Sequence, residues 1–490
     1  MARLLPLLIV LAGLLAAPAA HAAFSPEVGI EDERLLLGSA EAPDIVFEWR
    51  RIGVDVVRVH ASWGRLAPKG KRKPGGFSAG NHRDRRYDWG ALDAAVGLVH
   101  GNGMKVMLSV TGPGPLWTSP SRRRAGFKPK PGEFKLFAKA VATRYADQVD
   151  RYLIWNEPNL TLVPKQECSR RGCSLVAPHL YRGLVRAAGP AIKRADPRAE
   201  IGIGELAPIG GVGKISPLTF LRSMACVNDR YRKIRTGRCK GFRPAAGDVL
   251  GYHPHPQKRP PDTKNPNRQD AQFGDIPRLL GVIDRLTRMR AITAPNRQLT
   301  LRLTEFGYQT KPPDRFIGVS LSQQARYLQM AAYLASKQRR VKTVTQYQWR
   351  DEPVRRLGSG ARRYAGWQSG LRFVSDKPKP AMRAFERPFV GVTSRRSKSV
   401  LLWGQVRAGA GHELALEYRP SGSSTWGQLE RVSTDESGVW SRRLAAPEPG
   451  GYRFRLVDPA TGAATGEVSG IVTIAARRPR APVITASRVG

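Results

Sequence analysis

A short apolar run, Tyr152–Trp155, stops abruptly at Asn156, Glu157 and Pro158. The run is typical of a buried β-strand. Pro158 ends it, because proline has no backbone N–H for a strand ladder and disfavours helical backbone at the residue before it. A glutamate is therefore held at the carboxyl end of a buried strand. Functional side chains of (β/α)₈ barrels occupy this position.

A second strand of the same kind lies far downstream. The run Leu299–Thr304 is followed directly by Glu305, Phe306 and Gly307. In a parallel barrel the carboxyl ends of all strands meet at one face, so two strand-end glutamates can face one another across its mouth. The sequence therefore predicts that Glu157 and Glu305 form a pair of carboxylates in one site.

Between Phe24 and Phe389, short apolar runs alternate with amphipathic stretches, which is the pattern of a parallel sheet with helical crossovers. The predicted strands are Glu27–Ile30, Val54–His60, Met104–Val110, Tyr152–Trp155, Glu200–Gly204, Val249–Tyr252, Leu299–Thr304 and Thr343–Gln348. The predicted helices include Asp88–Gly101, Glu133–Ala146, Pro178–Ala195, Ile276–Arg290 and Ser320–Arg339. Eight strands with intervening helices predict an α/β fold, a (β/α)₈ TIM barrel, with Glu157 after the fourth strand and Glu305 after the seventh.

The pattern changes after Pro388. Short alternating strands separated by Gly, Pro, Ser and Asp turns predict a small C-terminal β-sandwich, loosely similar to immunoglobulin or fibronectin modules. The last segment is basic, and we expect it to be a disordered tail. The chain is thereby divided into a leader at 1–22, a barrel at 23–388, a sandwich at 389–475 and a basic tail at 476–490.

The first 22 residues have the layout of a secretory signal peptide. Arg3 precedes an apolar run from Leu4 to Ala17, and Ala20-His21-Ala22 is a small-x-small cleavage site. A transmembrane anchor is the alternative, but the run is short for a bilayer span and prolines interrupt its ends. No later segment is long and apolar enough to span a membrane. We expect an exported, extracellular protein.

The four cysteines fit an oxidising compartment. Cys168 and Cys173 are close in sequence, and Cys226 and Cys239 bracket a longer charged loop. Two local disulfides are the simplest of the three connectivities that four cysteines allow. A zinc site is the competing interpretation, but the Cys-x-x-Cys spacing that would favour it is missing.

The chain is strongly basic, with 81 lysines and arginines against 39 acidic residues and a formal net charge of +42. Such a charge predicts attraction to polyanions. However, the sequence has no basic helix or heptad pattern of a known DNA-binding type, so a specific nucleic-acid partner is not expected. Three of the most basic segments, 65–86, 122–130 and 258–268, fall in loops after predicted strands and hence on the face of the glutamate pair.

The residues around both glutamates resemble those of clan A, a large group of retaining glycoside hydrolases with barrel folds. Trp155–Asn159 is similar to the acid/base motif of that clan, and Thr304–Gly307 to its nucleophile strand. The resemblance implies that Glu157 is the general acid/base, Glu305 the nucleophile and Asn156 a donor to the sugar 2-hydroxyl. It covers the barrel and leaves the C-terminal module unexplained.

Further positions follow from the same resemblance. The run Val54–His60 is similar to the second strand of the clan, which implies that Arg58 lies beside the nucleophile and keeps it ionised. Trp349, after the eighth strand, and Trp117, after the third, are the implied sugar-stacking aromatics. Clan members often carry a non-proline cis peptide just after the tryptophan that corresponds to Trp349.

The sixth strand departs from the pattern of the clan. His253 matches a histidine position, but His255 stands where many members have a tyrosine that hydrogen-bonds the nucleophile. Either His255 donates to Glu305 or Tyr252 takes over that role. Glu205, which ends the fifth strand, is expected to be structural.

The resemblance implies a secreted retaining O-glycosidase that acts on a β-linked polysaccharide or oligosaccharide and needs no metal or cofactor. The most similar families are the cellulase-like one and the xylosidase and iduronidase one, whose acid/base motif also reads Trp-Asn-Glu-Pro-Asn. The alternative is a catalytically silent glycan-binding surface protein. The basic loops add the hypothesis that the substrate is an anionic glycan. The alternative is that basic residues are merely tolerated in these loops and have no role in binding. The oligomeric state is not predicted.

Overall fold

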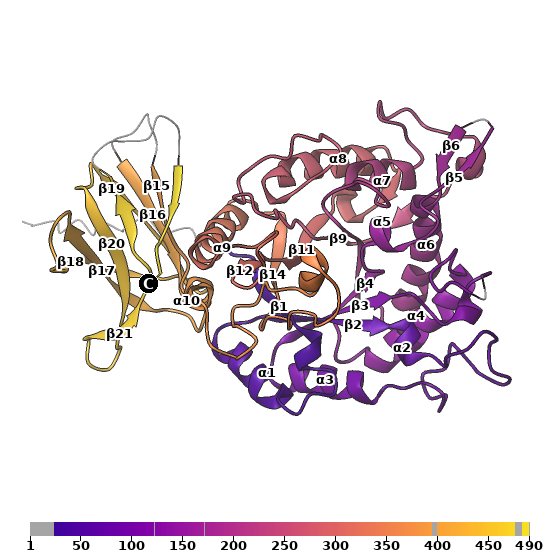
Figure 1. Cartoon of the computed structure of the whole chain (residues 1–490), viewed down its shortest axis with the longest axis horizontal. Helices are drawn as coiled ribbons and strands as arrows, with labels where there is room; N and C mark the ends of the chain where they lie inside the picture. The colour runs from indigo at the N-terminus through magenta and orange to yellow at the C-terminus, as the bar shows by residue number, and fades with distance from the viewer. Residues whose placement is uncertain (1–23, 122, 171, 394–398, 476–482, 490) are drawn as a thin grey trace, which may run out of the picture.

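Eight parallel strands close into a barrel in the computed structural model, which describes residues 24–121, 123–170, 172–393, 399–475 and 483–489 (Figure 1). The barrel strands are β1 (Glu27–Glu31), β2 (Val56–Ser62), β3 (Lys105–Thr111), β4 (Arg151–Ile154), β7 (Glu200–Leu206), β9 (Val249–Tyr252), β11 (Thr300–Phe306) and β14 (Val341–Tyr347). They follow one another around the barrel in chain order, and β14 pairs with β1 to close it. The predicted TIM barrel is confirmed.

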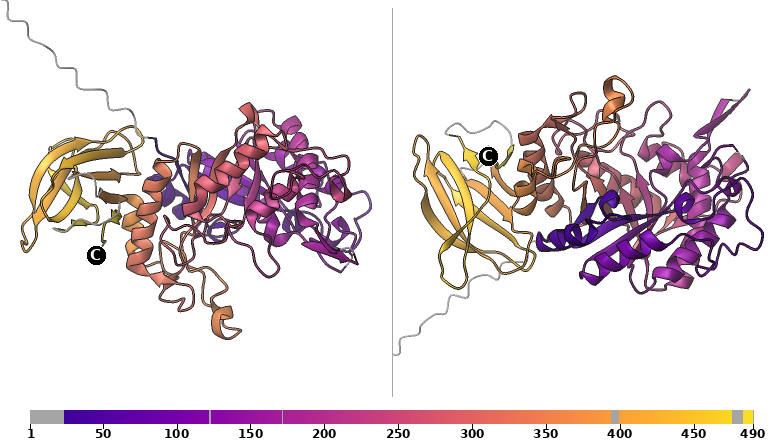
Figure 2. Two further views of the ribbon diagram at one scale, coloured as in Figure 1. Left: turned by 90° about the horizontal axis from the view of Figure 1, so that it is seen from above. Right: turned by 60° about the horizontal axis from the view of Figure 1, so that its bottom comes forward.

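Helices surround the strands on the outside of the barrel (Figure 2). They are α1 (Ala42–Arg51), α2 (Trp63–Leu66), α3 (Gly90–Gly101), α4 (Pro131–Tyr145), α5 (Pro158–Thr161), α6 (Ala177–Ala195), α7 (Pro217–Met224), α8 (Ile276–Arg288), α9 (Leu321–Ser336) and α10 (Pro380–Glu386). The five predicted helices match α3, α4, α6, α8 and α9 with small differences at their ends. For example, α9 begins at Leu321 because Ser320 caps it in a capping box with Gln323.

Smaller elements decorate the loops. The short strands are β5 (Gln166–Ser169), β6 (Gly172–Leu175), β8 (Ala245–Ala246), β10 (Ile292–Thr293), β12 (Thr310–Lys311) and β13 (Val319–Ser320). The 3₁₀ turns are η1 (Glu33–Leu35), η2 (Leu116–Thr118), η3 (Gly237–Cys239), η4 (Phe273–Asp275), η5 (Pro295–Arg297) and η6 (Gly360–Tyr364). Strands β5 and β6 form a hairpin in the loop after β4, beyond the predicted acid/base.

The amino ends of the barrel strands meet in a network of charged side chains, which we call the lower network. Glu27 of β1 accepts hydrogen bonds from Lys105 and Arg151 (both 2.7 Å) and from Arg302 (2.8 Å). Arg302 also donates to Glu200 at the start of β7 (2.8 Å). Burial raises the pKa of Glu27, but its hydrogen bonds with Arg151 and Lys105 outweigh this effect and lower the pKa to about 2.

Two antiparallel sheets follow the barrel in the described part of the chain and pack as a β-sandwich. One holds β19, β16, β15 and β23, and the other holds β18, β17, β20 and β21, with β22 paired to β20. Their bounds are β15 (Phe389–Thr393), β16 (Ser399–Gln405), β17 (Glu413–Pro420), β18 (Gly427–Ser433), β19 (Val439–Ala445), β20 (Gly450–Val457), β21 (Ala464–Val468), β22 (Val472–Ile474) and β23 (Val483–Ala486). Phe389, Trp440 and Phe454 form its core.

The predicted basic tail requires a correction. Residues 476–482 lie outside the described residues, but Val483–Ala486 form β23, which pairs antiparallel with β15. The segment Val483-Ile484-Thr485-Ala486 has the residue pattern of a strand. The arginines before it made the whole segment look like a basic tail when it was judged by composition. The C-terminal segment is therefore part of the sandwich.

The sandwich rests against helix α9 of the barrel (Figures 1 and 2). The fully buried side chain of Gln329 accepts from the Phe389 N–H (3.0 Å) and donates to the Ser487 carbonyl (3.0 Å). The ring of Tyr333 packs edge-on against Trp403, with 5.6 Å between ring centroids. One barrel helix thus binds both the first and the last described strand of the sandwich.

Both predicted disulfides are present in the described residues, between Cys168 and Cys173 and between Cys226 and Cys239. The first joins β5 to β6. The predicted leader lies outside the described residues. Within the described ranges, no helix has the length and apolar character needed to cross a bilayer.

Candidate active site

The backbone after β4 turns sharply and presents Glu157 at the mouth of the barrel. Trp155 (φ 68°) and Glu157 (φ 44°) both have left-handed backbone, and α5 begins directly behind them at Pro158. Such backbone is strained for residues with a side chain and persists where contacts hold it. Here the Glu157 N–H donates to the Glu205 carbonyl (2.9 Å), and Trp155 Nε1 donates to Thr161 (2.9 Å).

Glu305, on β11, stands opposite Glu157. An oxygen of each carboxylate and a ring nitrogen of His253 all lie within 4.8 Å of one another. The Glu157 side chain is 18% exposed and that of Glu305 is 9% exposed, so both reach solvent. The carboxyl groups of inverting glycosidases stand about 6.5–9.5 Å apart to admit a water molecule, whereas those of retaining ones stand about 5–5.5 Å apart. Two oxygens within 4.8 Å of each other are nearer to the shorter of these separations.

Arg58, on β2, lies fully buried beneath the pair. Its Nη1 donates to Glu305 (2.8 Å), and its Nη2 donates to the side-chain oxygen of Asn156 (2.9 Å). Because an arginine can only donate, it also sets the orientation of the Asn156 amide, whose NH₂ group is left to face elsewhere. The Asn156 N–H donates to Thr111 (3.0 Å), which fixes this residue from the other side.

Two further glutamates share the guanidinium of Arg58. Glu31, at the end of β1, accepts from Nη1, and Glu205, on β7, accepts from Nε (2.8 Å). Glu31 is 2% exposed and Glu205 is fully buried. Sequence reasoning missed Glu31, although it carries the same signal as Glu157: a carboxylate at the carboxyl end of a buried strand. We call Arg58, Glu31, Glu205 and Glu305 the upper network.

The carboxylates of the upper network differ in their affinity for protons. Burial raises the pKa of Glu305, but the charges of His253 and Arg58 outweigh it and hold the pKa well below its usual range. At Glu31 burial prevails over Arg58 and raises the pKa to about 7. Burial also raises the pKa of Glu205, but Arg58 outweighs it and the pKa is lowered. Glu305 is thus the ionised carboxylate that a nucleophile requires.

His253 is buried between the two candidate catalytic residues. Its Nδ1 lies 3.1 Å from Glu157, and its Nε2 lies 3.5 Å from Glu305. Burial lowers the pKa of His253, but the negative charge of Glu305 and the contact with Glu157 outweigh it and raise the pKa to about 10. His253 therefore keeps its proton up to alkaline pH, in short contact with Glu157.

His255, and not Tyr252, faces Glu305 on the β9 side. The Nε2 atom of His255 lies 3.5 Å from Glu305. The hydroxyl of Tyr252 donates to the Ala271 carbonyl, and its ring is fully buried. The alternative in which Tyr252 replaces the missing tyrosine is therefore wrong.

Neither predicted sugar-stacking tryptophan reaches the cleft. Trp349 is fully buried and packs edge-on against Trp49, with 6.3 Å between ring centroids. Trp117 is 5% exposed, and its Nε1 donates to the Pro68 carbonyl (2.8 Å). An aromatic ring can stack on a sugar only with a free face, so both assignments as substrate-binding residues are corrected to core positions.

Tyr347 and Trp367 form the aromatic wall of the cleft instead. The ring of Trp367 lies 5.0 Å from that of His255 and 5.2 Å from that of Tyr347, measured between centroids. Trp367 is partly exposed. The non-proline cis peptide follows Tyr347, the last residue of β14, rather than Trp349. Trp367 lies deep in the long loop after β14, where no periodicity marks it.

The first of the predicted basic segments is exposed in the loop after β2, at the carboxyl end of that strand. The loop after β2 carries exposed lysines and arginines at Lys69, Lys71, Arg72, Lys73 and Arg85. Lys73 pairs with Glu133 (2.8 Å). These side chains form a charged rim at some distance from the buried pair.

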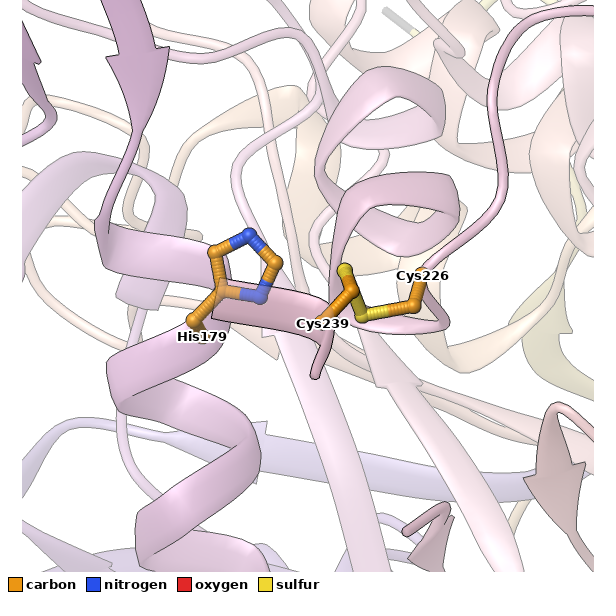
Figure 3. Close-up of side chains that lie close together, drawn as sticks. All are labelled: His179, Cys226 and Cys239. Atoms are coloured by element: carbon orange, nitrogen blue, oxygen red, sulfur yellow. A yellow bond between two sulfur atoms is a disulfide. The ribbon is translucent and has the colours of Figure 1, made fainter. Parts of the chain in front are cut away.

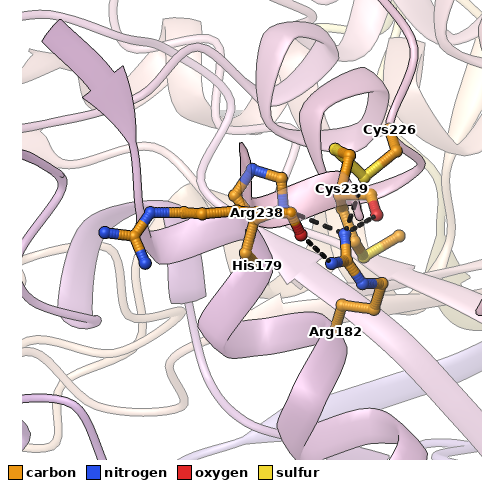
Figure 4. Close-up of a disulfide and its surroundings, with 6 residues drawn as sticks. His179, Arg182, Cys226, Arg238 and Cys239 are labelled. Atoms are coloured by element: carbon orange, nitrogen blue, oxygen red, sulfur yellow. Dashed lines mark hydrogen bonds between the residues drawn. A yellow bond between two sulfur atoms is a disulfide. The ribbon is translucent and has the colours of Figure 1, made fainter. Parts of the chain in front are cut away.

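Another group of possible metal ligands among the described residues is held by a disulfide. His179, Cys226 and Cys239 place a ring nitrogen and two sulfurs within 4.8 Å of one another (Figure 3). The two sulfurs are bonded to each other, and Arg182 donates to His179 (2.9 Å) and to the Cys226 sulfur (3.2 Å) (Figure 4). A guanidinium in this position disfavours a metal ion, so the competing zinc interpretation finds no support at these cysteines.

The fold has counterparts among solved structures. A family 39 glycoside hydrolase from Bacteroides cellulosilyticus WH2 matches with a TM-score of 0.51 at 15% identity, over 86% of this chain and 80% of that one. A glucosidase from Croceicoccus marinus matches with a TM-score of 0.47 at 11% identity, over 86% and 95%. Xylanase 10B from Thermotoga petrophila RKU-1 matches with a TM-score of 0.43 at 15% identity, over 74% of this chain and 92% of that one.

The likeness is one of fold. No family model and no curated protein sequence matches this chain. The assignment of a reaction therefore depends on the geometry of the two carboxylates and the groups that hold them.

Proposed function

We propose that this protein is a retaining O-glycosidase of the clan A type, with Glu305 as nucleophile and Glu157 as general acid/base. The observation that carries the proposal is the pair of carboxylates whose oxygens lie within 4.8 Å at the ends of β4 and β11. Further support comes from Arg58 and His253, which contact this pair, and from the barrel fold shared with a family 39 glycoside hydrolase.

The reaction has two steps. In the first, Glu305 attacks the anomeric carbon while Glu157 gives its proton to the glycosidic oxygen; the C–O bond breaks, and the sugar remains as an ester of Glu305. In the second, the Glu157 carboxylate takes a proton from water, and the water oxygen attacks the anomeric carbon. The sugar leaves with its original configuration, and both carboxyl groups are restored.

The surrounding residues have roles that follow from their contacts. Arg58 keeps Glu305 ionised, and the oriented amide of Asn156 donates to the sugar 2-hydroxyl. His253 supplies a nearby source for the proton that Glu157 delivers, since the two side chains are 3.1 Å apart. Tyr347 and Trp367 present ring faces and edges against which sugar C–H groups pack.

Azide rescue with an activated aryl glycoside tests the two assigned roles separately. Glu305→Gly should lose turnover and, with azide, recover it and release a glycosyl azide of inverted configuration. Glu157→Gly should keep formation of the glycosyl-enzyme but slow its hydrolysis by about 10²–10⁴-fold. With azide it should release a glycosyl azide of retained configuration.

The same experiment distinguishes the proposed enzyme from a catalytically silent glycan-binding protein. Such a protein would turn over no aryl glycoside in the unaltered form or in either variant. Inverted products from both variants would contradict the assigned roles while leaving an enzyme. Glu430→Gly, in the sandwich, serves as a control that should not respond to azide.

The proposed setting is outside the cell, and the proposed substrates are β-linked polysaccharides or oligosaccharides, with a preference for anionic chains. The signal-like leader, two disulfides and the basic rim support this proposal. Turnover of acidic and neutral polymers across a salt series tests it. Acidic chains should be favoured at low salt and lose that advantage as screening rises; equal rates and salt dependence would refute the preference.

We further propose that the barrel, residues 23–388, carries the catalysis and that the module from residue 389 supports it. Trp403 and Trp440 are 2% and 3% exposed, which leaves Trp426 as the half-buried tryptophan of this module. Trp426 lies under the guanidinium groups of Arg419 and Arg453.

A further inference from the structure

A cavity of about 170 Å³ opens beside Glu157. Its walls come from the loops that follow β4, β7, β9, β11 and β14, so five segments distant in sequence build it together. Trp367 and His255, which lie 5.0 Å apart between ring centroids, form one side.

The position of the catalytic pair relative to this cavity indicates what enters it. Glu157 lines the cavity, whereas Glu305 is absent from the described residues that line it. A general acid touches the oxygen of the bond that breaks, and the leaving group extends from that oxygen away from the nucleophile. On the proposed function, the cavity therefore lies on the side of the leaving group.

The walls of the cavity are mostly apolar. Leu160, Pro208, Ile209 and Ile317 line it together with the ring of Trp367. A sugar ring carries several hydroxyl groups, and each of them loses water on entering such walls and costs free energy unless it finds a hydrogen-bond partner.

Few polar partners stand in these walls. Apart from Glu157 and His255, the polar lining side chains are Lys214, Gln257 and Gln309, of which the first two are exposed. The buried oxygen of the Gln309 side chain accepts no hydrogen bond from the described residues. Lys214 and Gln257 stand at the exposed edge, so the buried part of the walls offers one unsatisfied acceptor among the described residues. This suits a single hydroxyl better than the set that a second sugar carries.

Exposed apolar side chains continue the lining outward. Ile317 is 48% exposed, and its neighbour Phe316 is 37% exposed on the same loop. Val212, close to Lys214 in sequence, and Leu357, on the loop that carries Trp367, are 104% and 87% exposed. Exposed apolar side chains on the loops that also line a cavity are typical of a surface that a ligand covers.

We infer that this cavity is the leaving-group subsite and that it takes an apolar alcohol, alkyl or aryl, in preference to a second sugar. The inference rests on the proposed retaining mechanism. It replaces the polymeric substrates proposed above with glycosides of apolar alcohols, and the comparison with a disaccharide described below decides between the two substrate classes. The alcohol leaves with the proton from Glu157, and its chain packs against Leu160, Ile317 and Trp367.

Alkyl β-D-glucosides and β-D-xylosides from ethyl to octyl test the inference, because their leaving alcohols have nearly the same acidity and differ in length. The value of kcat/KM should rise by about two- to fourfold per methylene and level off once the cavity is full, since each buried methylene contributes about 0.8 kcal/mol. A flat series, or a disaccharide of the same sugar that exceeds the octyl glycoside, would overturn the inference.

Two variants locate the effect. Ile317→Ser should reduce the gain with chain length, whereas Val374→Ser, at a side chain that is 46% exposed and outside the cavity, should preserve it. An unchanged gain in Ile317→Ser would place the alkyl chain elsewhere and contradict the inference.

A binding measurement separates this inference from the proposed function. In Glu305→Gln, which cannot form the glycosyl-enzyme, calorimetric affinity for the alkyl glycosides should still increase with chain length. Hydrolysis of sugar–sugar bonds together with a flat series would refute the subsite and leave the function standing. Length-dependent binding without turnover in the unaltered protein would refute the function and leave an apolar binding site.

Discussion

The two ends of the barrel hold charged networks made of the same residue types in different proportions. In the lower network Lys105, Arg151 and Arg302 contact Glu27 and Glu200. In the upper network one arginine, Arg58, contacts three glutamates among the described residues. The lower carboxylates are 22% and 27% exposed, whereas Glu31 and Glu205 are almost completely buried.

The difference separates stability from chemistry. Where cations outnumber carboxylates at a half-open edge, every carboxylate is paired and water hydrates the rest, so the network holds strand ends together. Where carboxylates outnumber the cation in a dry interior, at least one must keep a proton, and the pKa values spread apart. Burial raises the pKa of Glu31 to about 7, whereas the hydrogen bonds to Arg151 and Lys105 lower that of Glu27 to about 2 against its own burial.

Removing one arginine from each network should have the largest effect. Arg58→Met leaves three buried carboxylates without their cation, so we expect a loss of roughly 3–5 kcal/mol in the free energy of unfolding, together with loss of turnover. Arg302→Met should cost less, since Glu27 and Glu200 can still be hydrated, and should leave kcat within about twofold. Urea unfolding and glycoside turnover measure both.

A compensated variant sharpens this test. Arg58→Met combined with Glu31→Gln and Glu205→Gln should regain much of the stability, because no uncompensated pair of buried charges remains. It should stay inactive, since Glu305 still lacks its cation. A comparable loss of kcat in Arg302→Met would show that the lower network also serves catalysis.

The pH dependence of stability should have opposite signs at the two ends. The lowered pKa of Glu27, about 2 against an ordinary 4.5, gives stability that is present above pH 4.5 and lost as pH falls toward 2. The raised pKa of Glu31, about 7, opposes ionisation, so stability falls as pH rises from 4.5 to 7.

Glutamine variants isolate each contribution. Glu27→Gln should be less stable than the unaltered protein at pH 6 and nearly equal to it at pH 2. Glu31→Gln should have a larger free energy of unfolding than the unaltered protein between pH 5 and pH 8, by an amount on the order of 1–3 kcal/mol. Chemical denaturation at several pH values measures both, and slopes of the same sign would contradict the comparison.

Replacing Glu205 in the upper network, compared with Glu200 in the lower one, should have the smallest effect on the protein. Glu205→Gln keeps the carbonyl that holds Glu157 but removes a negative charge near His253. We expect the pKa of His253 to fall, the alkaline limb of kcat/KM to move to lower pH, and kcat to drop by about tenfold with KM little changed. Glu200→Gln should leave the pH profile unchanged; an identical shift there would indicate an unspecific electrostatic effect.

The sequence was sufficient for the features that local rules determine. Apolar periodicity located all eight barrel strands, and the proline stop after β4 placed Glu157 at a strand end. Glu31 was missed although it directly follows the predicted first strand, because that strand is short and partly polar and its end is weakly marked; β1 in fact continues to Glu31. Positions at strand ends are thus predictable to within the error of a boundary.

Loop aromatics could not be predicted in the same way. Trp349 lies two residues beyond β14, where the backbone turns it toward Trp49 and the guanidinium of Arg372. Trp367 reaches the cleft through the path of a long loop. That path depends on packing between distant segments, which a spacing rule does not contain.

Helix α9 has a consequence for the order of events during synthesis. Gln329 satisfies its side-chain hydrogen bonds with Phe389 and Ser487, which leave the ribosome well after the barrel strands. Until the sandwich strands have been translated, the outer face of α9, with Met330 and Tyr333, lacks its partners Val390, Trp403 and Ala486. The growing chain therefore exposes this apolar face until the sandwich has been translated, and the barrel and sandwich complete one interface together.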